Sequence, residues 1–126
     1  MSEADFFARL RAMTGCGILL DSTNVYITSR DLGGSAESFV QQLPSEHIRE
    51  IHLVGYGTDR HARLVDDHAH AIQPEIWQLY EDAPSLATPE YVIIERDASF
   101  PHIEDLLAEV ARARGVPAAA TSGARG

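Results

Sequence analysis

Residues 17–21 read Gly-Ile-Leu-Leu-Asp, a short apolar run that ends in an acidic residue. Two later runs have the same character: residues 50–55 read Glu-Ile-His-Leu-Val-Gly, and residues 91–95 read Tyr-Val-Ile-Ile-Glu. Nearly continuous apolar runs of this length are typical of parallel strands that are buried on both faces. The sequence therefore predicts three parallel strands.

Helical patterns separate these predicted strands. We expect helices at residues 2–11, 36–43, 74–80 and 103–112, and the third could extend to Leu86. A turn is expected after Asp21, and a long loop rich in His, Asp and Gly is expected from Gly55 to Ile72. Strands that alternate with helices predict an α/β fold in which helices cover a parallel sheet. No glycine-rich phosphate loop follows any of the strands, which weighs against a nucleotide-binding sheet.

The composition limits the class of protein. The chain has 126 residues, of which 44% are hydrophobic and 23% charged, as in one ordinary globular domain. We assign this domain to residues 1–115 and expect a disordered tail at residues 116–126. The formal net charge of −9 argues against nucleic acid as a partner, because phosphates require basic side chains.

Neither a membrane segment nor a secretory signal is evident in the sequence. No run approaches the roughly 20 apolar residues that span a bilayer, and the first residues lack the basic and apolar regions of a signal peptide. We therefore expect no membrane partner and a cytoplasmic location. Cys16 is the single cysteine; we expect a buried thiol there, with a ligand or nucleophile as the alternative.

Polar side chains gather at the carboxyl ends of the predicted strands, the edge that carries the chemistry in parallel α/β folds. Strand alternation places Leu19 and Asp21 on one face and likewise Ile93 and Glu95. A carboxylate that continues such an apolar face is costly unless it is paired or bound to a metal. The polar residues in question are Asp21 and Asn24 after the first strand, His52 within the second, Asp66, Asp67, His68 and His70 in the loop after it, and Glu95 and Asp97 at the end of the third.

Each candidate also has a structural explanation when taken alone. Asp21 and Asn24 could cap or turn the chain, His52 could be a hydrogen-bonded core histidine, and residues 66–70 could form a solvated loop. Glu95 is the hardest to explain in this way, because two isoleucines lead directly into it. Together the set favours a metal site, and oxygen and imidazole ligands without a thiolate set suit iron, manganese or zinc.

Five blocks of the sequence, in this order, resemble a known family: Gly-Cys-Gly-Ile-Leu-Leu-Asp-Ser-Thr-Asn, Glu-Ile-His-Leu-Val-Gly, Leu-Val-Asp-Asp-His-Ala-His-Ala-Ile, Glu-Ile-Trp-Gln-Leu-Tyr and Val-Ile-Ile-Glu-Arg-Asp. They are similar to the C-terminal portion of the multinuclear non-haem iron enzymes that include the methanobactin-type peptide oxidases. The resemblance covers roughly residues 3–114.

The resemblance implies a fold and a function. The fold would be the C-terminal half of a xylose-isomerase-like (β/α)₈ TIM barrel that holds two or three iron ions. The activity would be an iron-dependent oxidation at a cysteine of a ribosomally synthesised precursor peptide, which a small partner protein delivers. The resemblance implies six metal ligands, whereas it identifies no further catalytic residues. The candidate ligands are Asp21, Asn24, His52, Asp66, His68 and Glu95.

The chain departs from the family in two ways. The family has asparagine where this chain has Thr23, and its barrel is about twice as long, in line with the roughly 250 residues typical of the fold. We therefore expect either a separate N-terminal barrel half or self-association. Two alternatives stay open: a catalytically inactive half-barrel that acts as an assembly or binding module, and a divalent-metal sugar isomerase or endonuclease, although the chain has no lysine to act as a base.

Overall fold

The three predicted strands form one parallel sheet. The computed structural model describes residues 1–83 and 89–115. The sheet has the order β1-β2-β5, with both pairs parallel. Its strands are β1 (Ile18–Asp21), β2 (Ile48–Val54) and β5 (Tyr91–Glu95). The predicted α/β class is confirmed, and the described residues form an open sheet, as in part of a (β/α)₈ barrel, and not a closed barrel.

Four helices occur where the sequence predicted them. They are α1 (Glu3–Thr14), α3 (Ala36–Gln42), α4 (Pro74–Asp82) and α5 (Ile103–Ala113). The first begins with a reciprocal capping box, in which the Ser2 hydroxyl accepts from the Asp5 backbone and the Asp5 carboxylate accepts from the Ser2 backbone. It ends at Gly15, which has a positive φ that residues with a side chain seldom adopt.

A further helix, α2 (Ser22–Leu32), occupies the segment in which a turn was expected after Asp21. The Asp21 side chain caps this helix by accepting a hydrogen bond from the Asn24 backbone. The prediction that Asn24 lies in a turn is therefore wrong. The hydrophobic pattern of the sequence did not predict α2, because this helix is rich in β-branched and small polar residues, which have modest helix propensity. Packing against β2, α3, α4 and the hairpin stabilises it instead.

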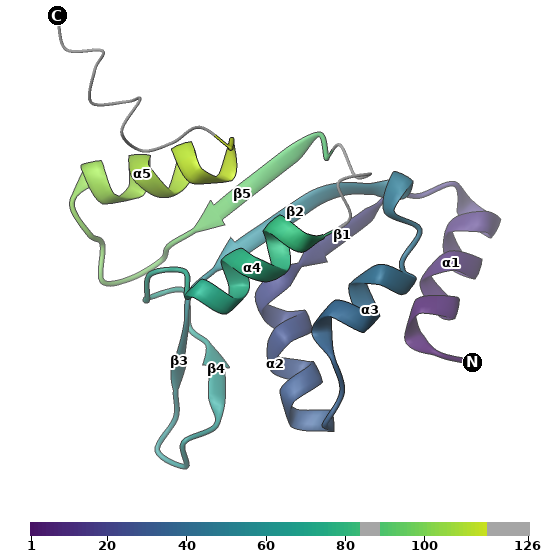
Figure 1. Cartoon of the computed structure of the whole chain (residues 1–126), viewed down its shortest axis with the longest axis horizontal. Helices are drawn as coiled ribbons and strands as arrows, with labels where there is room; N and C mark the ends of the chain where they lie inside the picture. The colour runs from purple at the N-terminus through teal and green to yellow at the C-terminus, as the bar shows by residue number, and fades with distance from the viewer. Residues whose placement is uncertain (84–88, 116–126) are drawn as a thin grey trace, which may run out of the picture.

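The expected long loop after β2 contains an antiparallel hairpin, formed by β3 (Tyr56–Thr58) and β4 (Leu64–Asp66). The Asp59 carboxylate closes its turn by accepting from the backbones of His61 and Arg63. The prediction that a long loop alone fills residues 55–72 is therefore wrong. The hairpin projects from the carboxyl end of the sheet (Figure 1) and fixes Asp66 opposite Tyr56.

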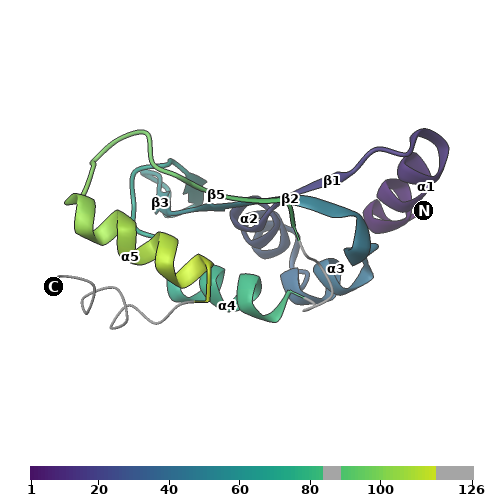
Figure 2. The ribbon, with the colours of Figure 1, turned by 90° about the horizontal axis from the view of Figure 1, so that it is seen from above.

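All of α2, α3, α4 and α5 lie on the same side of the sheet (Figure 2). The side chains that point toward them form the core, with Leu53 and Ile76 fully buried and Trp77 almost so. The other side carries what we call the open face: Leu19, Asp21, Glu50, His52, Tyr91, Ile93 and Glu95. The register aligns these residues across the strands in rows, Leu19–Glu50–Tyr91 and then Asp21–His52–Ile93, with Glu95 beyond.

The open face contradicts the prediction that the strands are buried on both faces. Leu19, Tyr91 and Ile93 are 53%, 63% and 38% exposed, because no described element covers them. Cys16 is also exposed, so the expectation of a buried thiol is wrong as well. It lies between α1 and β1, before the strand enters the core.

Two predicted segments cannot be compared with the structure. The tail at residues 116–126 and the extension of the third helix to Leu86 lie outside the described residues. In the part of the chain that the structure describes, no helix is long and apolar enough to cross a membrane.

Candidate metal centre

Asp21, His52 and Glu95 meet at the carboxyl end of the open face. One ligand atom from each lies within 4.8 Å of the others. Strand register explains the convergence: Asp21 and His52 pair across β1 and β2, and Glu95 follows two residues after Ile93, which pairs with His52. All three therefore point to the same side from three neighbouring strands. We call them the triad.

The imidazole of His52 lies between two carboxylates. Its Nε2 is 2.6 Å from Oε1 of Glu50, and its Nδ1 is 3.4 Å from Oε1 of Glu95. Glu50 lies one row deeper on the open face, two residues before His52 on the same strand. Sequence reasoning overlooked Glu50, although strand alternation places it on the same face as His52.

A second group of side chains adjoins the triad. His68 Nε2 lies 3.2 Å from Oδ1 of Asp66, and His68 Nδ1 lies 3.0 Å from Oδ2 of Asp97. The other oxygen of Glu95, Oε2, lies 3.8 Å from His68 Nδ1. Glu95 thus faces His52 with one oxygen and His68 with the other, and so joins the two groups.

The backbone holds His68 in an uncommon conformation. Its φ is +54°, the left-handed region that non-glycine residues seldom adopt. Its carbonyl accepts a hydrogen bond of 2.8 Å from the backbone of Asp97, just beyond β5. This bond ties the segment after the hairpin to the end of the sheet. Strained residues of this kind are concentrated at functional sites.

Asn24 connects the helix α2 to this cluster. Its side-chain Nδ2 donates to Oδ2 of Asp66 at 3.1 Å, while its backbone donates to Asp21 at 2.8 Å. All six candidate ligands that the resemblance implies are therefore linked by short contacts at one end of the sheet. Thr23, where the resemblance led us to expect asparagine, is fully buried and donates to the Val54 carbonyl at 2.6 Å. Its hydroxyl therefore joins α2 to the end of β2.

The electrostatics of the second group are unusual. Burial raises the pKa of Asp66, and the nearby Asp21 carboxylate adds to this, although His68 opposes it. Burial by itself would lower the pKa of His68, but the carboxylates of Asp66, Glu95 and Asp97 outweigh that effect, so its pKa is raised. The cluster therefore has an excess of negative charge that draws protons or other cations.

Two observations show that a metal cation fits this donor set. Oδ1 of Asp66 is buried and has no hydrogen bond among the described residues, although Nε2 of His68 lies 3.2 Å away. In addition, a His52 that donates to Glu50 through Nε2 turns the lone pair of Nδ1 toward Glu95, so two acceptors face each other. A cation between them would satisfy both, and carboxylate and imidazole donors suit iron, manganese or zinc.

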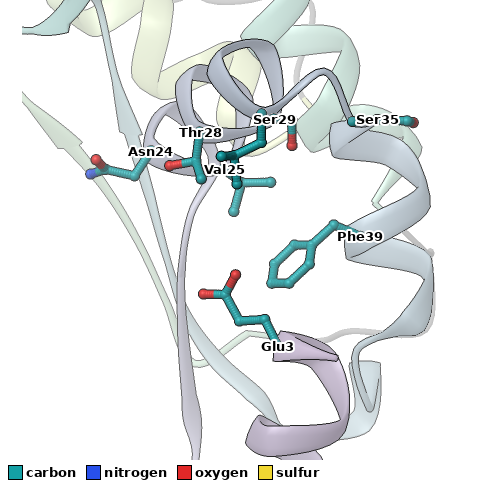
Figure 3. A pocket seen from close by; sticks show the side chains of 9 residues that line it. Glu3, Asn24, Val25, Thr28, Ser29, Ser35 and Phe39 are labelled. Carbon is teal, nitrogen blue, oxygen red and sulfur yellow. The ribbon is translucent and has the colours of Figure 1, made fainter. Parts of the chain in front are cut away.

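One pocket of the described structure lies away from the triad. It is a cavity of about 300 Å³ among α1, α2 and α3, with Val25, Phe39 and Glu3 around it (Figure 3). Asn24 lines its border but points away from its centre (Figure 3), and its amide donates to Asp66. None of the other five candidate residues lines this cavity. The acidic and histidine cluster therefore lies outside this cavity.

Comparisons with known proteins show the family to which the chain belongs. A family model described as "RiPP precursor modification enzyme MbnB/TglH/ChrH" matches residues 1–118, where RiPP denotes a ribosomally synthesised and post-translationally modified peptide. A UPF0276 protein of Caulobacter sp. (strain K31) is 40% identical over 125 residues, which are 96% of this chain and 45% of the relative.

Other relatives give the same picture. A UPF0276 protein of Chromobacterium violaceum is 38% identical over 92% of this chain and 42% of its own length. Another, from Bordetella pertussis, is 38% identical over 95% of this chain and 45% of its own length. The chain therefore spans less than half the length of these relatives.

Proposed function

The chain belongs to the MbnB/TglH/ChrH family of RiPP precursor modification enzymes, and on that premise we propose that it forms the C-terminal half of an iron-dependent enzyme that oxidises cysteines of a precursor peptide. The observation that supports this best is the triad, whose ligand atoms lie within 4.8 Å of one another at the carboxyl edge of the sheet. In barrels of this kind that edge carries the chemistry.

Two neighbouring cation positions follow from the side chains. Asp21, His52 and one oxygen of Glu95 would hold the first, because their ligand atoms converge within 4.8 Å. Asp66 and His68, whose Oδ1 and Nε2 are 3.2 Å apart, would supply part of the second. Asn24 orients Asp66 through its amide. A third iron would need ligands from outside this chain. Bound iron would supply redox chemistry with dioxygen and would favour the thiolate form of a substrate cysteine.

The remaining contacts orient these ligands. Asp97 accepts from Nδ1 of His68 and so leaves Nε2 for the second cation position, beside Asp66. Leu19 and Ile93 give the open face an apolar floor next to the carboxylates. Such a floor would exclude water from the peptide segment that carries the cysteine.

The partners follow from the same surfaces. Among the described residues neither β1 nor β5 has a second neighbour, and the open face between them is uncovered. We propose that further barrel strands, from a separate polypeptide or a second copy, cover this face. The precursor peptide and a small protein that delivers it would then reach the carboxyl end of the completed barrel.

Metal binding by the isolated chain is the first test. The purified chain is loaded anaerobically with ferrous iron and desalted, and its iron content is measured by mass spectrometry. Because the chain supplies only part of a ligand shell, we expect weak binding, with fewer than two irons retained, and no turnover of a cysteine-containing peptide. Two or more firmly held irons would contradict the division of the site between two polypeptides.

Completion of the barrel is the second test. The chain is co-expressed with the N-terminal part of the Caulobacter UPF0276 relative, and the complex is assayed for iron and for a mass change at a precursor cysteine. We expect both to appear together and to be lost in His52→Ala. A folded complex that holds no metal would overturn the proposal and would favour an inactive assembly module.

A further inference from the structure

Glu50 occupies a position on the open face where a carboxylate is costly. Its neighbours in the same row are Leu19 on β1 and Tyr91 on β5, both apolar or aromatic. Its side chain is only 32% exposed, and His52 is the one hydrogen-bond partner that it has among the described residues. Once further strands cover the open face, as proposed above, a carboxylate in this row would lower stability unless it is paired. The presence of a carboxylate at this position, paired with His52, therefore suggests that it has a functional role.

The hydrogen bond between these residues has only one arrangement when Glu50 is ionised. A carboxylate accepts and cannot donate, so Nε2 of His52 must carry the proton at the 2.6 Å contact. In the neutral imidazole, Nδ1 is then the free lone pair. That atom faces Glu95 at 3.4 Å and belongs to the cluster that includes Asp21.

We propose that Glu50 is a positioning residue, which holds His52 in the Nε2–H tautomer and so directs Nδ1 to the cation shared with Asp21 and Glu95. Histidine ligands commonly donate their second ring N–H to a carboxylate, which fixes the ring and makes the ligating nitrogen more basic. This inference rests on the proposed function, because it takes His52 to be a ligand. It adds a residue from the row below the triad, outside the candidate ligand set.

Two substitutions separate orientation from charge. Glu50→Gln keeps an oxygen that accepts from Nε2 but removes the charge, whereas Glu50→Leu removes the acceptor at similar volume. Glu104→Gln, an exposed position on α5, is the matched control for loss of one negative charge. Each variant is made in the full chain, and its folding is checked by circular dichroism.

The first measurement does not depend on metal. Long-range ¹H–¹⁵N spectra in mildly alkaline buffer report which ring nitrogen carries the proton, and His52→Gln assigns the signals. We expect the Nε2–H tautomer in the parent chain, in Glu50→Gln and in the control, and a mixture of tautomers in Glu50→Leu. A parent chain with Nδ1–H, or a Leu variant with an unchanged tautomer, would overturn the inference whether or not the chain binds metal.

The second measurement is the affinity for cobalt(II), whose visible spectrum reports its ligands. We expect Glu50→Leu to bind about 10–100-fold more weakly, the range found when outer partners of metal ligands are removed. Glu50→Gln should recover most of that loss. Equal losses in both variants would show that Glu50 acts through its charge or as a direct ligand, and would refute the positioning role.

The two readouts distinguish failure of the inference from failure of the proposed function. If the parent chain shows the Nε2–H tautomer and loses it in Glu50→Leu, Glu50 orients the ring as proposed. If that same parent chain, completed by the relative's N-terminal part, then binds no metal, the proposed function fails. The part of the inference that takes His52 to be a metal ligand then fails with it. If metal binds but the tautomer does not depend on Glu50, the inference alone fails.

Discussion

Oε1 of Glu95 lies 3.4 Å from Nδ1 of His52, across the boundary between the neighbouring strands β5 and β2. Because Nε2 of His52 already contacts Glu50, the nitrogen that faces Glu95 is an acceptor in the neutral ring. Two acceptors at this separation repel each other unless a cation lies between them. Substitution of Glu95 is therefore the most direct test of the hypothesis that a metal cation binds between these two residues.

Glu95→Gln should therefore have opposite effects on metal affinity and on metal-free stability. We expect cobalt(II) or ferrous iron to bind at least about tenfold more weakly, which corresponds to about 1.4 kcal/mol. Without metal, and at a pH where His68 is neutral, loss of one of several facing carboxylates should leave the free energy of unfolding unchanged or raise it slightly. Urea denaturation with a chelator and with metal measures both, with Glu104→Gln as the control. A variant that is less stable in chelator would contradict the repulsion argument.

Asp21 has two roles that substitution can separate. It belongs to the triad, and its side chain caps α2 through the Asn24 backbone. Asparagine is as good a helix cap as aspartate, so Asp21→Asn should keep the stability of the metal-free chain but weaken metal binding. Asp21→Ala should also lose about 0.5–2 kcal/mol of stability through the missing cap. Urea unfolding in chelator compares the two; equal stabilities would exclude the capping contribution.

The pKa of His68 predicts a pH dependence of stability. Its pKa is raised from the ordinary value of 6.5, with the burial effect outweighed by Asp66, Glu95 and Asp97. A raised pKa in the folded state means that the folded chain binds the proton more tightly than the unfolded one. The resulting stability is complete below about pH 6.5 and declines as the pH rises through the higher folded-state pKa. The raised pKa of Asp66 acts in the same direction at lower pH.

Chemical denaturation of the metal-free chain across this range tests the sign. We expect the parent chain to lose stability as the pH rises above 6.5, and His68→Gln to lose the dependence in that window. His61→Gln is a suitable control, because His61 is exposed in the hairpin turn. Stability that increases with pH over this window in the parent chain would show that the carboxylates do not stabilise the protonated ring.

The strands and the polar residues at their ends could be predicted from the sequence. Apolar runs mark the strands, and alternation along each run shows which polar side chains share a face. Asp21, His52 and Glu95 each lie at or near the end of an apolar run, and parallel pairing brings such ends together. The sequence did not reveal α2 or the hairpin, because tertiary contacts rather than local propensity stabilise them. The hairpin and the left-handed His68 place Asp66 and His68 beside Glu95, and no periodic pattern encodes that arrangement.

A buried ion pair should contribute more to stability than an exposed one of similar geometry. Nη2 of Arg96 lies 3.3 Å from both oxygens of Glu109, and the Arg96 side chain is only 6% exposed. Glu109 also accepts from the Ile72 backbone and so joins α5 to the segment before α4. Glu109→Ala leaves the arginine buried without a partner, which costs about 3–5 kcal/mol.

The comparison pair is Glu81 and Arg112, which make a 2.8 Å contact on the surface. Glu81→Ala should cost only about 0–1 kcal/mol, because solvent screens exposed charges. Urea denaturation curves of both variants give the two values under the same conditions. Similar losses would mean that water reaches Arg96 and that α5 is not held to the sheet by this pair.

The last prediction concerns the uncovered edges and the open face. Strands β1 and β5 each have one free edge among the described residues, and neither strand carries the lysine or proline that commonly blunts a natural edge. Leu19 and Ile93 add exposed apolar surface between the edges. We therefore expect the chain to self-associate at micromolar concentration, as measured by sedimentation velocity.

The variants for this test place a charge at the edge of β5 or away from the sheet. Ile93→Lys should shift the chain toward monomer, whereas Leu32→Lys, at an 80% exposed position at the end of α2, should not.

Association that buries the open face brings acidic clusters from two copies together, which is unfavourable unless cations neutralise them. Ferrous iron should therefore strengthen association of the parent chain, and Glu95→Gln should reduce this dependence. A monomer that unfolds cooperatively with and without iron would instead indicate a self-contained three-stranded domain that needs no further strands to cover its open face.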